Sequence, residues 1–410
     1  MANVSSSNGL EKRPKLRFPG FDEPYRTTPL GEIASLVNRT DPKSNAPIMM
    51  LSAGNGFIMQ SEKYSRDNAG QSLKKYILLK QGELAYNHGA SKAKQFGCCY
   101  ELTEPEARIP YVYHCFKINE DEYTPYVAMA LNNAKMDQQL KRLVSSSVRM
   151  DGLLNISFED YMSVTLHLPS FIEQKHIADF LKKLDERITA QERLVTYLKK
   201  YKRGLLSREF AAVAHTTSNI EYEGKILDYF SLSSGSTPSS TNKSFYSGNI
   251  RWVSSGELKP KYLCETNQHI SAEAVSSCNL REYPANTLLI AMYGLEAAGV
   301  RGTASILNVP ATISQACMAI QQTGKIDIEY LYYWYIYNGQ WIGIRIAQGT
   351  KQQNLSTETL GNLKICAPSY SKQKEVCKLL SQIDNLIEKE SQKIDLLYAV
   401  KKGLLQQLFI

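Results

Sequence analysis

Two segments of this chain repeat each other without a gap. Residues 169–210 read PSFIEQKHIADFLKKLDERITAQERLVTYLKKYKRGLLSREF and residues 368–409 read PSYSKQKEVCKLLSQIDNLIEKESQKIDLLYAVKKGLLQQLF, so matched positions lie 199 residues apart. The register extends upstream, where an Asn-x-Ser triplet at residues 155–157 recurs at residues 354–356. A chain ordered as variable block, repeat, variable block, repeat is a tandem of two similar units.

The apolar residues of each copy recur at alternating steps of four and three. This heptad spacing places apolar side chains along one seam of a helix. We therefore expect two long helices that pair through the seam, with Gln191 and Glu390 in equivalent polar layers. The alternative is that both helices are ordinary amphipathic members of a bundle. The predicted interface residues are Ile177, Leu181, Leu184, Ile188, Val195 and Leu198 in the first copy and Val376, Leu380, Ile383, Ile387, Ile394 and Leu397 in the second.

Each copy carries signals for the start of a helix. Ser170 follows a proline, and with Glu173 it fits a capping box, in which the two side chains satisfy backbone N–H groups of the first turn. The second copy keeps Ser369 but has Lys372 in place of the glutamate, so we expect a weaker cap there.

A glycine recurs near the end of both copies, as Gly204 and Gly403. Glycine inside a helix costs about 1 kcal/mol relative to alanine. Either these residues end the helices or they allow close packing, and the sequence leaves both readings open.

The length of the first predicted helix constrains how the two copies pair. A helix over residues 171–209 would be roughly 58 Å long at about 1.5 Å per residue. Residues 211–223 are small and polar, and as an extended linker they reach only about 40 Å. Because this linker is too short to return along the first helix, we expect the second helix to run antiparallel to it.

The predicted fold class is α+β: two globular mixed α/β domains separated by two long antiparallel coiled-coil helices, as a pseudo-two-fold tandem repeat. The predicted boundaries are a disordered N-terminus at 1–14, a first globular domain at 15–168, a central spacer helix at 169–210, a linker at 211–223, a second globular domain at 224–367 and a distal spacer helix at 368–410.

Cysteine usage, charge and hydropathy limit the class of protein. The eight cysteines form no C-x-x-C pair, which argues against a zinc site and a disulfide framework and predicts free thiols and no bound metal. A formal charge of +8 permits a nucleic-acid partner without requiring one. No signal peptide or apolar run of the roughly 20 residues of a membrane span is present. We expect a cytoplasmic protein that does not bind membranes.

The motifs of common catalysts are missing from the sequence. There is no G-x-x-x-x-G-K-[ST] phosphate loop, and GLEAAGVRG at residues 294–302 does not fit G-x-G-x-x-G. No Asn-Pro-Pro-aromatic or Asp-Pro-Pro-aromatic signature of amino-methyltransferases occurs, nor does H-E-x-x-H. We therefore expect a binding protein without catalytic residues.

A segment of the first globular domain has the composition of a nucleic-acid contact. Lys92 and Lys94 lie among serine, glycine and alanine, close to Tyr86, Asn87 and His88. Cationic, amide and aromatic side chains on a flexible loop suit phosphates and base edges. We predict that these five residues contact DNA; the alternative is an ordinary hydrated surface loop.

A second candidate contact lies near the end of the second globular domain. Gln348, Lys351, Gln352 and Asn354 cluster in one predicted turn. Glutamine and asparagine can read adenine with two hydrogen bonds, and lysine can bind guanine or phosphate. Taken singly, each of these residues is also consistent with an ordinary loop.

The repeated segments resemble the specificity subunit of type I restriction–modification systems. The phrases that carry this resemblance are PSFIEQKHIADFLKKLD at residues 169–185, YKRGLL at 201–206 and KKGLLQQLF in the second copy. Lys372 departs from the pattern and weakens only the expected helix cap.

The variable blocks are similar to the target-recognition domains of the same family. In the second block the similar phrases are GSTPSS at residues 235–240, GNIRWVSSGEL at 248–258 and PATISQA at 310–316. In the first block they are LRFPGF at 16–21 and GELAYNHG at 82–89. The resemblance covers nearly the whole chain.

The resemblance implies a DNA-recognition subunit with no activity of its own. Each target-recognition domain would read one half of a split, asymmetric DNA site, and the helix pair would set the number of unread base pairs. Two modification subunits would methylate adenine N6 with S-adenosylmethionine, and two restriction subunits would add ATP-dependent translocation and cleavage. S-adenosylmethionine, ATP and Mg would lie on these partners, so no cofactor is expected on this chain.

The resemblance also implies which loops of the second domain touch DNA. These are the loops at residues 235–243, 253–259 and 348–354. Beyond the residues already named, the candidates are Ser236, Thr237, Ser239, Lys243, Ser254, Ser255 and Lys259.

Two other classes of function compete with this interpretation. A coiled-coil adaptor with two protein-binding domains is the main alternative, and the amide-rich loops and basic charge argue weakly against it. A free-standing methyltransferase or nuclease is disfavoured by the missing motifs.

Overall fold

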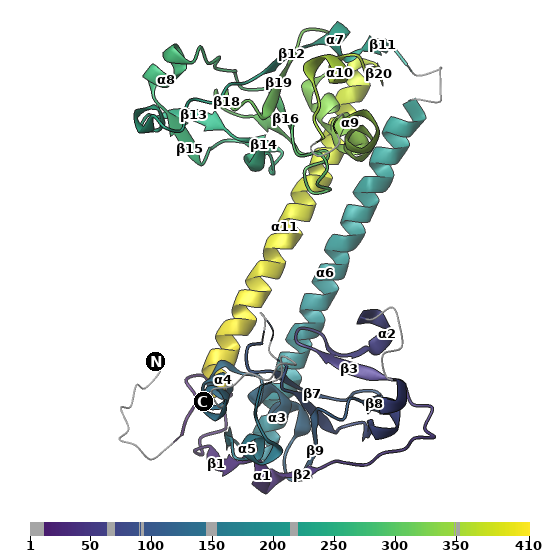
Figure 1. Ribbon diagram of the computed structural model, residues 1–410, viewed down its shortest axis with the longest axis vertical. Coiled ribbons are helices and arrows are strands. Elements are labelled where there is room, and N and C mark those ends of the chain that lie inside the picture. The colour runs from purple at the N-terminus through teal and green to yellow at the C-terminus, as the bar shows by residue number, and fades with distance from the viewer. Residues whose placement is uncertain are drawn as a thin grey trace. The chain divides into compact units, whose positions relative to one another are not determined.

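The computed structural model describes residues 12–63, 70–89, 91, 94–144, 154–213, 220–347, 349 and 353–410. The chain forms two compact units: Met1–Gln191 with Lys393–Ile410, here called unit 1, and Glu192–Gln392, called unit 2. Two long helices, α6 (Phe171–Val213) and α11 (Tyr370–Leu408), each contribute residues to both units (Figure 1).

Unit 1 is built on a four-stranded antiparallel sheet of order β2-β9-β6-β7, with strand pairs β1–β10, β3–β4 and β5–β8 beside it. Its strands are β1 (Arg26–Pro29), β2 (Ala34–Leu36), β3 (Met49–Ser52), β4 (Gly56–Met59), β5 (Ile77–Lys80), β6 (Leu84–Asn87), β7 (Cys98–Glu101), β8 (Glu106–Ile109), β9 (His114–Ile118) and β10 (Thr165–Leu168). Its short helices are α1 (Leu30–Ile33), α2 (Gln60–Lys63), η1 (Gly70–Lys75), α3 (Thr124–Ala130), α4 (Ala134–Leu143) and α5 (Phe158–Met162).

Unit 2 contains a five-stranded sheet of order β12-β19-β16-β17-β14 and a three-stranded sheet of order β15-β13-β18. Its strands are β11 (Tyr222–Lys225), β12 (Phe230–Ser234), β13 (Ile250–Val253), β14 (Tyr262–Leu263), β15 (Gln268–Ile270), β16 (Leu288–Ala291), β17 (Ala304–Leu307), β18 (Thr312–Ile313), β19 (Cys317–Gln322) and β20 (Lys364–Ala367). Its other helices are α7 (Ile226–Tyr229), η3 (Lys243–Tyr246), η4 (Ser255–Glu257), α8 (Ala272–Ser277), α9 (Ile328–Trp341), η5 (Ile342–Ile346) and α10 (Thr357–Gly361).

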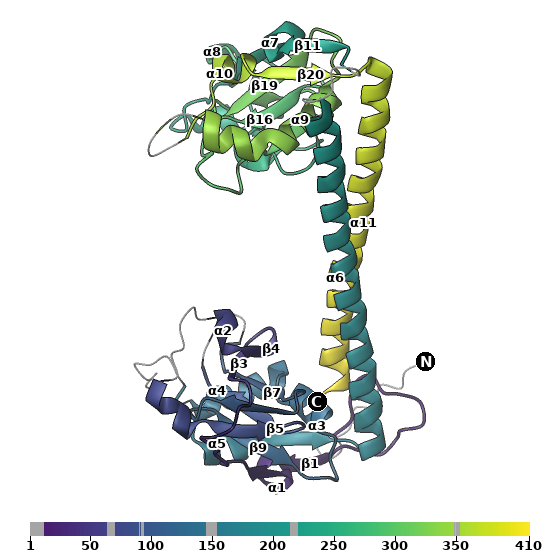
Figure 2. The ribbon, with the colours of Figure 1, turned by 90° about the vertical axis from the view of Figure 1, so that its right-hand side faces the viewer.

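Strand β16 shows how sequence pattern builds the core of unit 2. Four consecutive apolar residues make a strand that is buried on both faces. Because side chains alternate along a strand, Leu288 and Ile290 pack with the aromatic residues of α9 on one face, and Leu289 and Ala291 pack in a second cluster on the other. Figure 2 shows α9 beside the end of α6, where the rings of Phe210 and Tyr330 lie 5.1 Å apart.

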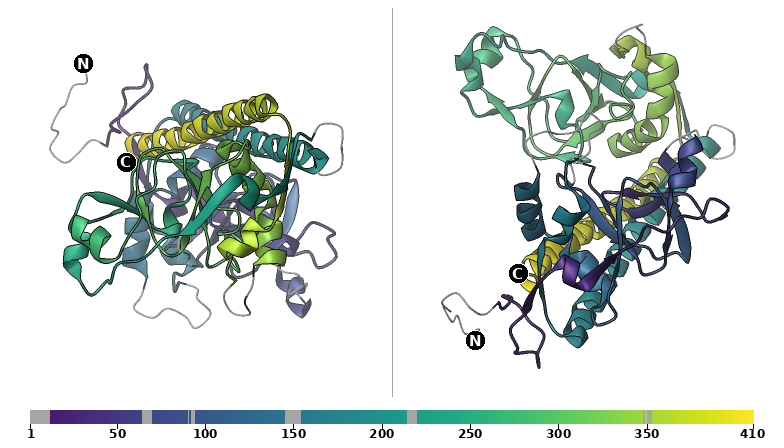
Figure 3. Two further views of the ribbon diagram at one scale, coloured as in Figure 1. Left: turned by 90° about the horizontal axis from the view of Figure 1, so that it is seen from above. Right: turned by 60° about the horizontal axis from the view of Figure 1, so that its bottom comes forward.

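Residues near the end of α11 complete unit 1. Leu408 and Phe409 are buried in the core of this unit, and the Phe409 ring stacks on Tyr126 with centroids 5.1 Å apart. The Leu16 amide donates to the Gln407 carbonyl at 3.1 Å, so the N-terminal segment lies against this end of the helix (Figure 3).

The expected fold class, mixed α/β globular parts with two long helices, is confirmed. The boundaries differ in detail, because α6 continues to Val213 and β11 begins at Tyr222, inside the expected linker. Of the segment predicted to be disordered, residues 1–14, the first eleven residues lie outside the described part of the chain. The backbone of Lys12 is held in place, because its carbonyl accepts a hydrogen bond from the Tyr25 amide at 2.8 Å.

The repeated glutamine docks each long helix onto its globular unit. In unit 2 the Gln373 side chain accepts from the Asp327 amide at 2.8 Å and donates to the Pro368 carbonyl at 2.9 Å. In unit 1 the equivalent Gln174 accepts from the Tyr123 amide at 2.9 Å and donates to the carbonyl of the equivalent proline at 3.0 Å. Both side chains are buried, and their hydrogen bonds offset the cost of burying the amide groups. These bonds join the start of α6 to the start of α3 and the start of α11 to the start of α9.

The predicted capping box at the start of α6 is only half formed. The Glu173 amide approaches the Ser170 hydroxyl at 3.4 Å, as expected. The Glu173 carboxylate instead accepts two hydrogen bonds from Arg17, at 2.9 and 2.8 Å, and one from Tyr25 at 3.3 Å. A fully buried carboxylate gains more from a paired guanidinium than from a backbone amide, which explains the difference.

Two equivalent ion pairs join α6 to α11 in antiparallel order. In unit 1 the Lys401 ammonium lies 2.5 Å from the Asp185 carboxylate. In unit 2 the Lys202 ammonium lies 2.5 Å from the Asp384 carboxylate. The residues of one pair are the repeat equivalents of the other, and residue numbers rise along α6 as they fall along α11.

The predicted seam residues face inward on both helices. Seven of the twelve are buried (Ile177, Leu181, Ile188, Val195, Val376, Leu380 and Ile383), and the other five are half-buried. Gly204 and Gly403 lie inside the helices, and a Cβ atom on either would meet nothing within 4 Å. Among the described residues, therefore, neither glycine ends its helix or makes a close packing contact.

We predict that Gln373→Leu destabilises unit 2 by about 1–3 kcal/mol, because it leaves the buried Asp327 amide and Pro368 carbonyl without their partner. The three tryptophans, Trp252, Trp334 and Trp341, all lie in unit 2, so urea unfolding followed by tryptophan fluorescence reports on this unit.

The matched control is Gln382→Leu, at an exposed position of the same helix. It should change stability by less than about 0.5 kcal/mol. Equal losses from both variants would contradict the docking role of Gln373.

Candidate nucleic-acid interface

The loop that follows β12 is held in one conformation by its backbone. A Cβ atom on Gly235 would lie 2.2 Å from the Ile313 carbonyl oxygen, so only glycine fits there. The Ser236 amide donates to the same carbonyl at 3.2 Å, and its own carbonyl accepts from the Trp252 indole at 3.3 Å. Trp252 is buried in a core cluster of unit 2.

The side chains of this loop point partly outward. Thr237, Ser239 and Lys243 are exposed, while Ser236 is half-buried. The Thr237 hydroxyl accepts from the Gln315 amide at 3.3 Å, and the Ser239 and Thr241 hydroxyls lie 2.8 Å apart. A rigid backbone that presents hydroxyl and ammonium groups has the chemistry of a phosphate and base-edge contact.

The next candidate loop is organised by Glu257. Its carboxylate accepts from the Ser254 amide at 2.8 Å and from the Ser254 hydroxyl at 3.0 Å, and it also accepts from the Asn267 amide. The Ser254 hydroxyl proton is therefore used inside the loop, and Ser255 is half-buried. Lys259 is exposed at the end of the loop and is the residue best placed for a DNA phosphate.

The third candidate loop is described only in part. Gln348, Lys351 and Gln352 lie outside the described residues, and Asn354 is half-buried. The neighbouring Gln353 amide donates to the Glu296 carboxylate at 3.0 Å, so this stretch is fastened to the glycine-rich segment at residues 294–302.

Two candidates of unit 1 are core residues, which corrects the prediction for them. Tyr86 lies in β6, the strand between β9 and β7, and is 1% exposed; its ring stacks on Tyr161 with centroids 3.9 Å apart. His88 is also buried, with its ring 4.9 Å from that of His114. Tyr86 and Asn87 end the inner strand β6, whose alternate residues face two cores, so the prediction of a loop is wrong for these two residues.

The other candidates of unit 1 are engaged locally. The Asn87 side chain accepts from the Gly89 amide at 2.9 Å, and the Lys94 ammonium donates to the Asn132 carbonyl at 2.7 Å. Lys92 lies outside the described residues.

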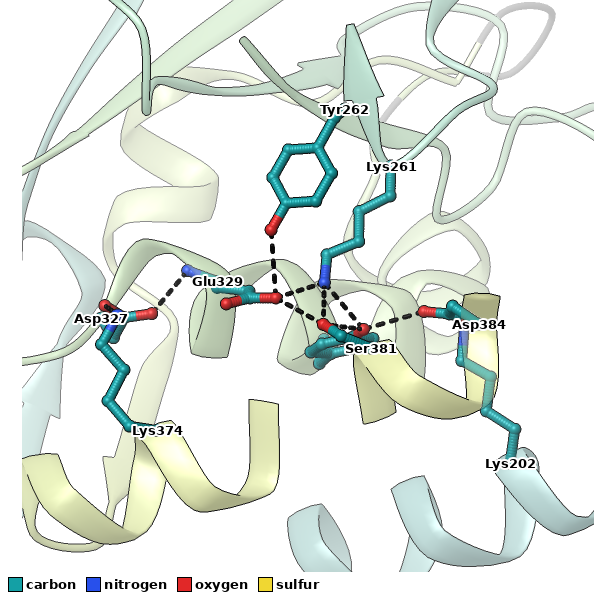
Figure 4. Close-up of polar contacts among 9 residues, drawn as sticks. Lys202, Lys261, Tyr262, Asp327, Glu329, Lys374, Ser381 and Asp384 are labelled. Carbon is teal, nitrogen blue, oxygen red and sulfur yellow. Dashed lines mark hydrogen bonds and ion pairs between the residues drawn. The ribbon is translucent and has the colours of Figure 1, made fainter. Parts of the chain in front are cut away.

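A polar cluster that the sequence did not predict joins the second candidate loop to α9 and α11. The ammonium of Lys261, two residues after Lys259, donates to the Glu329 carboxylate and lies 2.5 Å from the Ser381 hydroxyl and 2.9 Å from the Tyr333 hydroxyl. Figure 4 shows the Lys261, Glu329 and Ser381 side chains pointing toward one another.

The charges of this cluster stabilise each other. Burial alone would raise the pKa of the Glu329 carboxyl, but hydrogen bonds from Lys261 and Ser381 and the lysine charge outweigh burial and hold that pKa below its usual range. Burial and the Glu329 charge raise the pKa of Tyr262 to about 12. At neutral pH the Glu329 carboxyl is therefore ionised, and the Tyr262 hydroxyl beside it is neutral.

The cluster continues to α6 through a tyrosine. The Tyr333 hydroxyl donates to the Asp384 carboxylate at 2.8 Å. Asp384 also pairs with Lys202 of α6, and Figure 4 labels both residues. The residue before β14, the helices α9 and α11, and α6 are thereby joined by hydrogen bonds that end in the Lys202–Asp384 ion pair.

Three potential metal ligands lie near this cluster, but lysines already face the carboxylates. Ligand atoms of Asp327, Glu329 and Cys377 lie within 4.8 Å of one another. The Lys374 ammonium lies 2.6 Å from the Asp327 carboxylate, and Lys261 pairs with Glu329. Burial raises the pKa of the Cys377 thiol, which disfavours the thiolate that a metal would need. The group is better explained as an ion-pair network.

The sequence offered only part of the signal for this cluster. Asp185 and Asp384 are equivalent positions of the two repeats, and so are Lys202 and Lys401. Lys261 and Glu329 lie in the variable block, where no repeat marks them.

Comparison with known families gives this geometry a context. Residues 219–398 match the family model described as "Type I restriction modification DNA specificity domain". This stretch of the chain is similar to a type I DNA specificity domain. This domain covers most of unit 2, including the loops at residues 235–243 and 254–259 and the polar cluster around Lys261.

Curated relatives support the same family. The chain is 28% identical over 190 residues to the MjaIX specificity subunit of Methanocaldococcus jannaschii, which covers 45% of this chain and 43% of the relative. It is 26% identical over 155 residues to the EcoR124I/EcoR124II specificity subunit of Escherichia coli, covering 37% and 38%. The matches thus span about two-fifths of each relative's length. The expected resemblance to type I specificity subunits is confirmed.

Solved structures extend the likeness to the whole fold. The type I system S subunit from M. genitalium aligns with a TM-score of 0.60 and 14% identity over 97% of this chain and 99% of its own. A chain from a structural study of type I complex assembly aligns with a TM-score of 0.58 and 16% identity over 96% and 99%. At these identities the likeness establishes the fold alone.

Across the described ranges, no helix combines the length and apolar character that a membrane span requires.

Proposed function

We propose that this chain is the DNA-recognition subunit of a type I restriction–modification complex, binding a bipartite asymmetric site. The observation that carries this proposal is the match of residues 219–398 to the type I DNA specificity domain. The repeated docking of a globular unit onto a long helix, through Gln174 and Gln373, supports a second recognition domain in unit 1.

The DNA contacts of unit 2 would come from the exposed groups of its two anchored loops. Thr237, Ser239, Lys243 and Lys259 are exposed on segments whose backbones are hydrogen-bonded in place. Such preorganised groups lose little conformational entropy on binding, which favours specific recognition. The loop at residues 348–354 keeps its predicted role as a third contact.

Partner subunits would dock on the outer faces of the long helices. In unit 2, a shallow pocket is lined by Tyr197, Lys200, Tyr201, Gly204, Leu205 and Arg208, with Tyr197 68% exposed and Tyr201 58%. The repeat equivalents in unit 1, Leu396 and Val400, are 64% and 44% exposed. Large apolar side chains exposed at equivalent positions fit one kind of partner bound twice. We assign these faces to two modification subunits.

Catalysis would reside entirely on the partners. Modification subunits would methylate adenine N6 with S-adenosylmethionine, and two restriction subunits would cleave DNA with ATP and Mg. The missing catalytic motifs support a non-catalytic role for this chain in the cytoplasm, where these substrates are found.

The function is tested by co-expressing the chain with its modification subunit in a methylation-free host and mapping modified adenines by long-read sequencing. We expect one bipartite motif, modified on both strands. A stable complex that produces no motif and binds no DNA would instead favour the alternative, a coiled-coil adaptor with two protein-binding domains.

We predict that Lys243→Ala and Lys259→Ala each weaken DNA binding by the complex. If each lysine neutralises one phosphate, the slope of log K against log salt concentration should fall by about 1. Fluorescence anisotropy with a duplex that contains the mapped motif measures both quantities. Lys364→Ala, at an exposed position of β20, is the control, and an unchanged slope in a loop variant would remove that lysine from the DNA contact.

We predict that Tyr201→Glu and Val400→Glu each remove one bound modification subunit, because a carboxylate would be buried in an apolar contact. Native mass spectrometry counts the subunits, which should fall from two to one in each single variant and to zero in the double variant. Thr196→Glu places the same charge on a different exposed face of α6 and should leave two subunits bound. Two subunits on the double variant would contradict the assignment.

A further inference from the structure

We propose that Lys261 is a positioning residue that fixes the DNA-reading loop at residues 254–259 on the long helices and so sets the spacer length that the complex accepts. This inference rests on the proposed function and adds a residue that holds unit 2 in register. It requires that Lys261 be fixed to the loop on one side and to the helices on the other.

The backbone of Lys261 is anchored directly after the loop. Its carbonyl accepts from the Ile306 amide at 2.7 Å, and the preceding Pro260 carbonyl accepts from the Ser305 hydroxyl at 2.6 Å. Both partners lie on β17, which pairs with β14 in the main sheet of unit 2. A movement of Lys261 would therefore carry the end of the loop with it.

The side chain of Lys261 reaches away from the loop to the helices. Its ammonium has three oxygen partners, in Glu329, Tyr333 and Ser381, which match its three N–H donors. The same ammonium lies 4.5 Å from the centre of the Tyr333 ring, and the side chain is 12% exposed. A lysine with every donor used and little exposure has one allowed position.

The hydrogen bonds run in a consistent direction through the cluster. Lys261 donates to Ser381, which donates to Glu329 at 2.7 Å. Lys261 also donates to Tyr333, which donates to Asp384 at 2.8 Å. Each hydroxyl thus receives one proton and gives one, so rotating any member breaks two bonds. Such networks define geometry more sharply than apolar packing, which tolerates sliding.

The cluster holds both long helices and not only one. Ser381 and Asp384 lie on α11, and Asp384 also binds Lys202 of α6. The repeat equivalent of Ser381 is Lys182, which is exposed, so this connection to the loop is a feature of unit 2 within the described residues.

To select one spacer length, the loop must be positioned along the DNA to within one base pair. One base pair spans about 3.4 Å along B-DNA, given about 34–36 Å per turn. A loop free to shift by the length of a side chain would reach a half-site one base pair nearer or farther. Removing Lys261 should therefore relax spacer selectivity and leave the half-site sequences unchanged.

The test compares wild type, Lys261→Met and Lys261→Arg as complete complexes, each co-expressed with the modification subunit. Plasmids carry the mapped motif with its spacer unchanged, one base pair shorter and one base pair longer. For Lys261→Met we expect methylation of the altered spacers to rise at least tenfold relative to the cognate site. Lys261→Arg, which keeps the charge and several donors, should restore part of the selectivity.

Controls separate this inference from folding and from the proposed function. Lys378→Met, at an exposed position of α11, should keep wild-type selectivity. Ser381→Ala, which removes one partner without touching Lys261, should show a smaller relaxation in the same direction. A bipartite motif from wild type supports the function whatever the variants do, and unchanged spacer selectivity in folded Lys261→Met overturns only the role of Lys261. A changed half-site sequence would also overturn it, because Lys261 would then contact DNA.

Hydrogen exchange on the chain without partners gives a readout that needs no methylation. Amides of residues 254–263 should exchange faster in Lys261→Met than in wild type or Lys378→Met. Equal exchange in all three would show that Lys261 does not hold the loop and would overturn the inference.

Discussion

Each globular unit depends on a segment of a long helix whose other part belongs to the other unit. Unit 1 needs residues 393–410 to cover its core, because Leu408 and Phe409 fill space between α3 and the start of α6. Unit 2 needs the second half of α6, whose Leu205, Leu206 and Phe210 join the cluster around α9. The burial of these apolar side chains is the main source of stability at both junctions.

Polar groups then decide how each helix is seated. Apolar contacts tolerate small rotations, whereas the buried amides of Gln174 and Gln373 have partners in fixed directions. Unit 1 adds the Arg17–Glu173 pair, and unit 2 adds the cluster around Lys261. The two units thus share the glutamine contact and the equivalent Lys–Asp ion pair, and they differ in the polar contacts that supplement these, as expected of tandem copies whose variable blocks have diverged.

The long helices and the fold class could be predicted because heptad spacing and repeat register are local signals. The candidate functional residues were harder to predict from the sequence. The loop prediction is wrong for Tyr86 because β6 is four residues long and its polar end resembles a turn, and His88, directly after the strand, is buried. Lys243 and Lys259 were placed on exposed loops in agreement with the structure, which does not test their contact with DNA. The Lys261 cluster escaped prediction because its members come from β14, α9, α11 and α6, which only the tertiary fold brings together.

The interleaving of the two units imposes an order on synthesis. Unit 2 is continuous from Glu192 to Gln392, so every residue of it has been made before the segment that completes unit 1 is translated. Residues 12–191 must wait for partners more than 200 positions downstream, and contacts of such sequence separation form slowly. A ribosome that stops before residue 393 releases a chain whose first unit exposes Tyr126 and its neighbours as apolar surface. The core of unit 1 is therefore completed only after every residue of unit 2 has been synthesised.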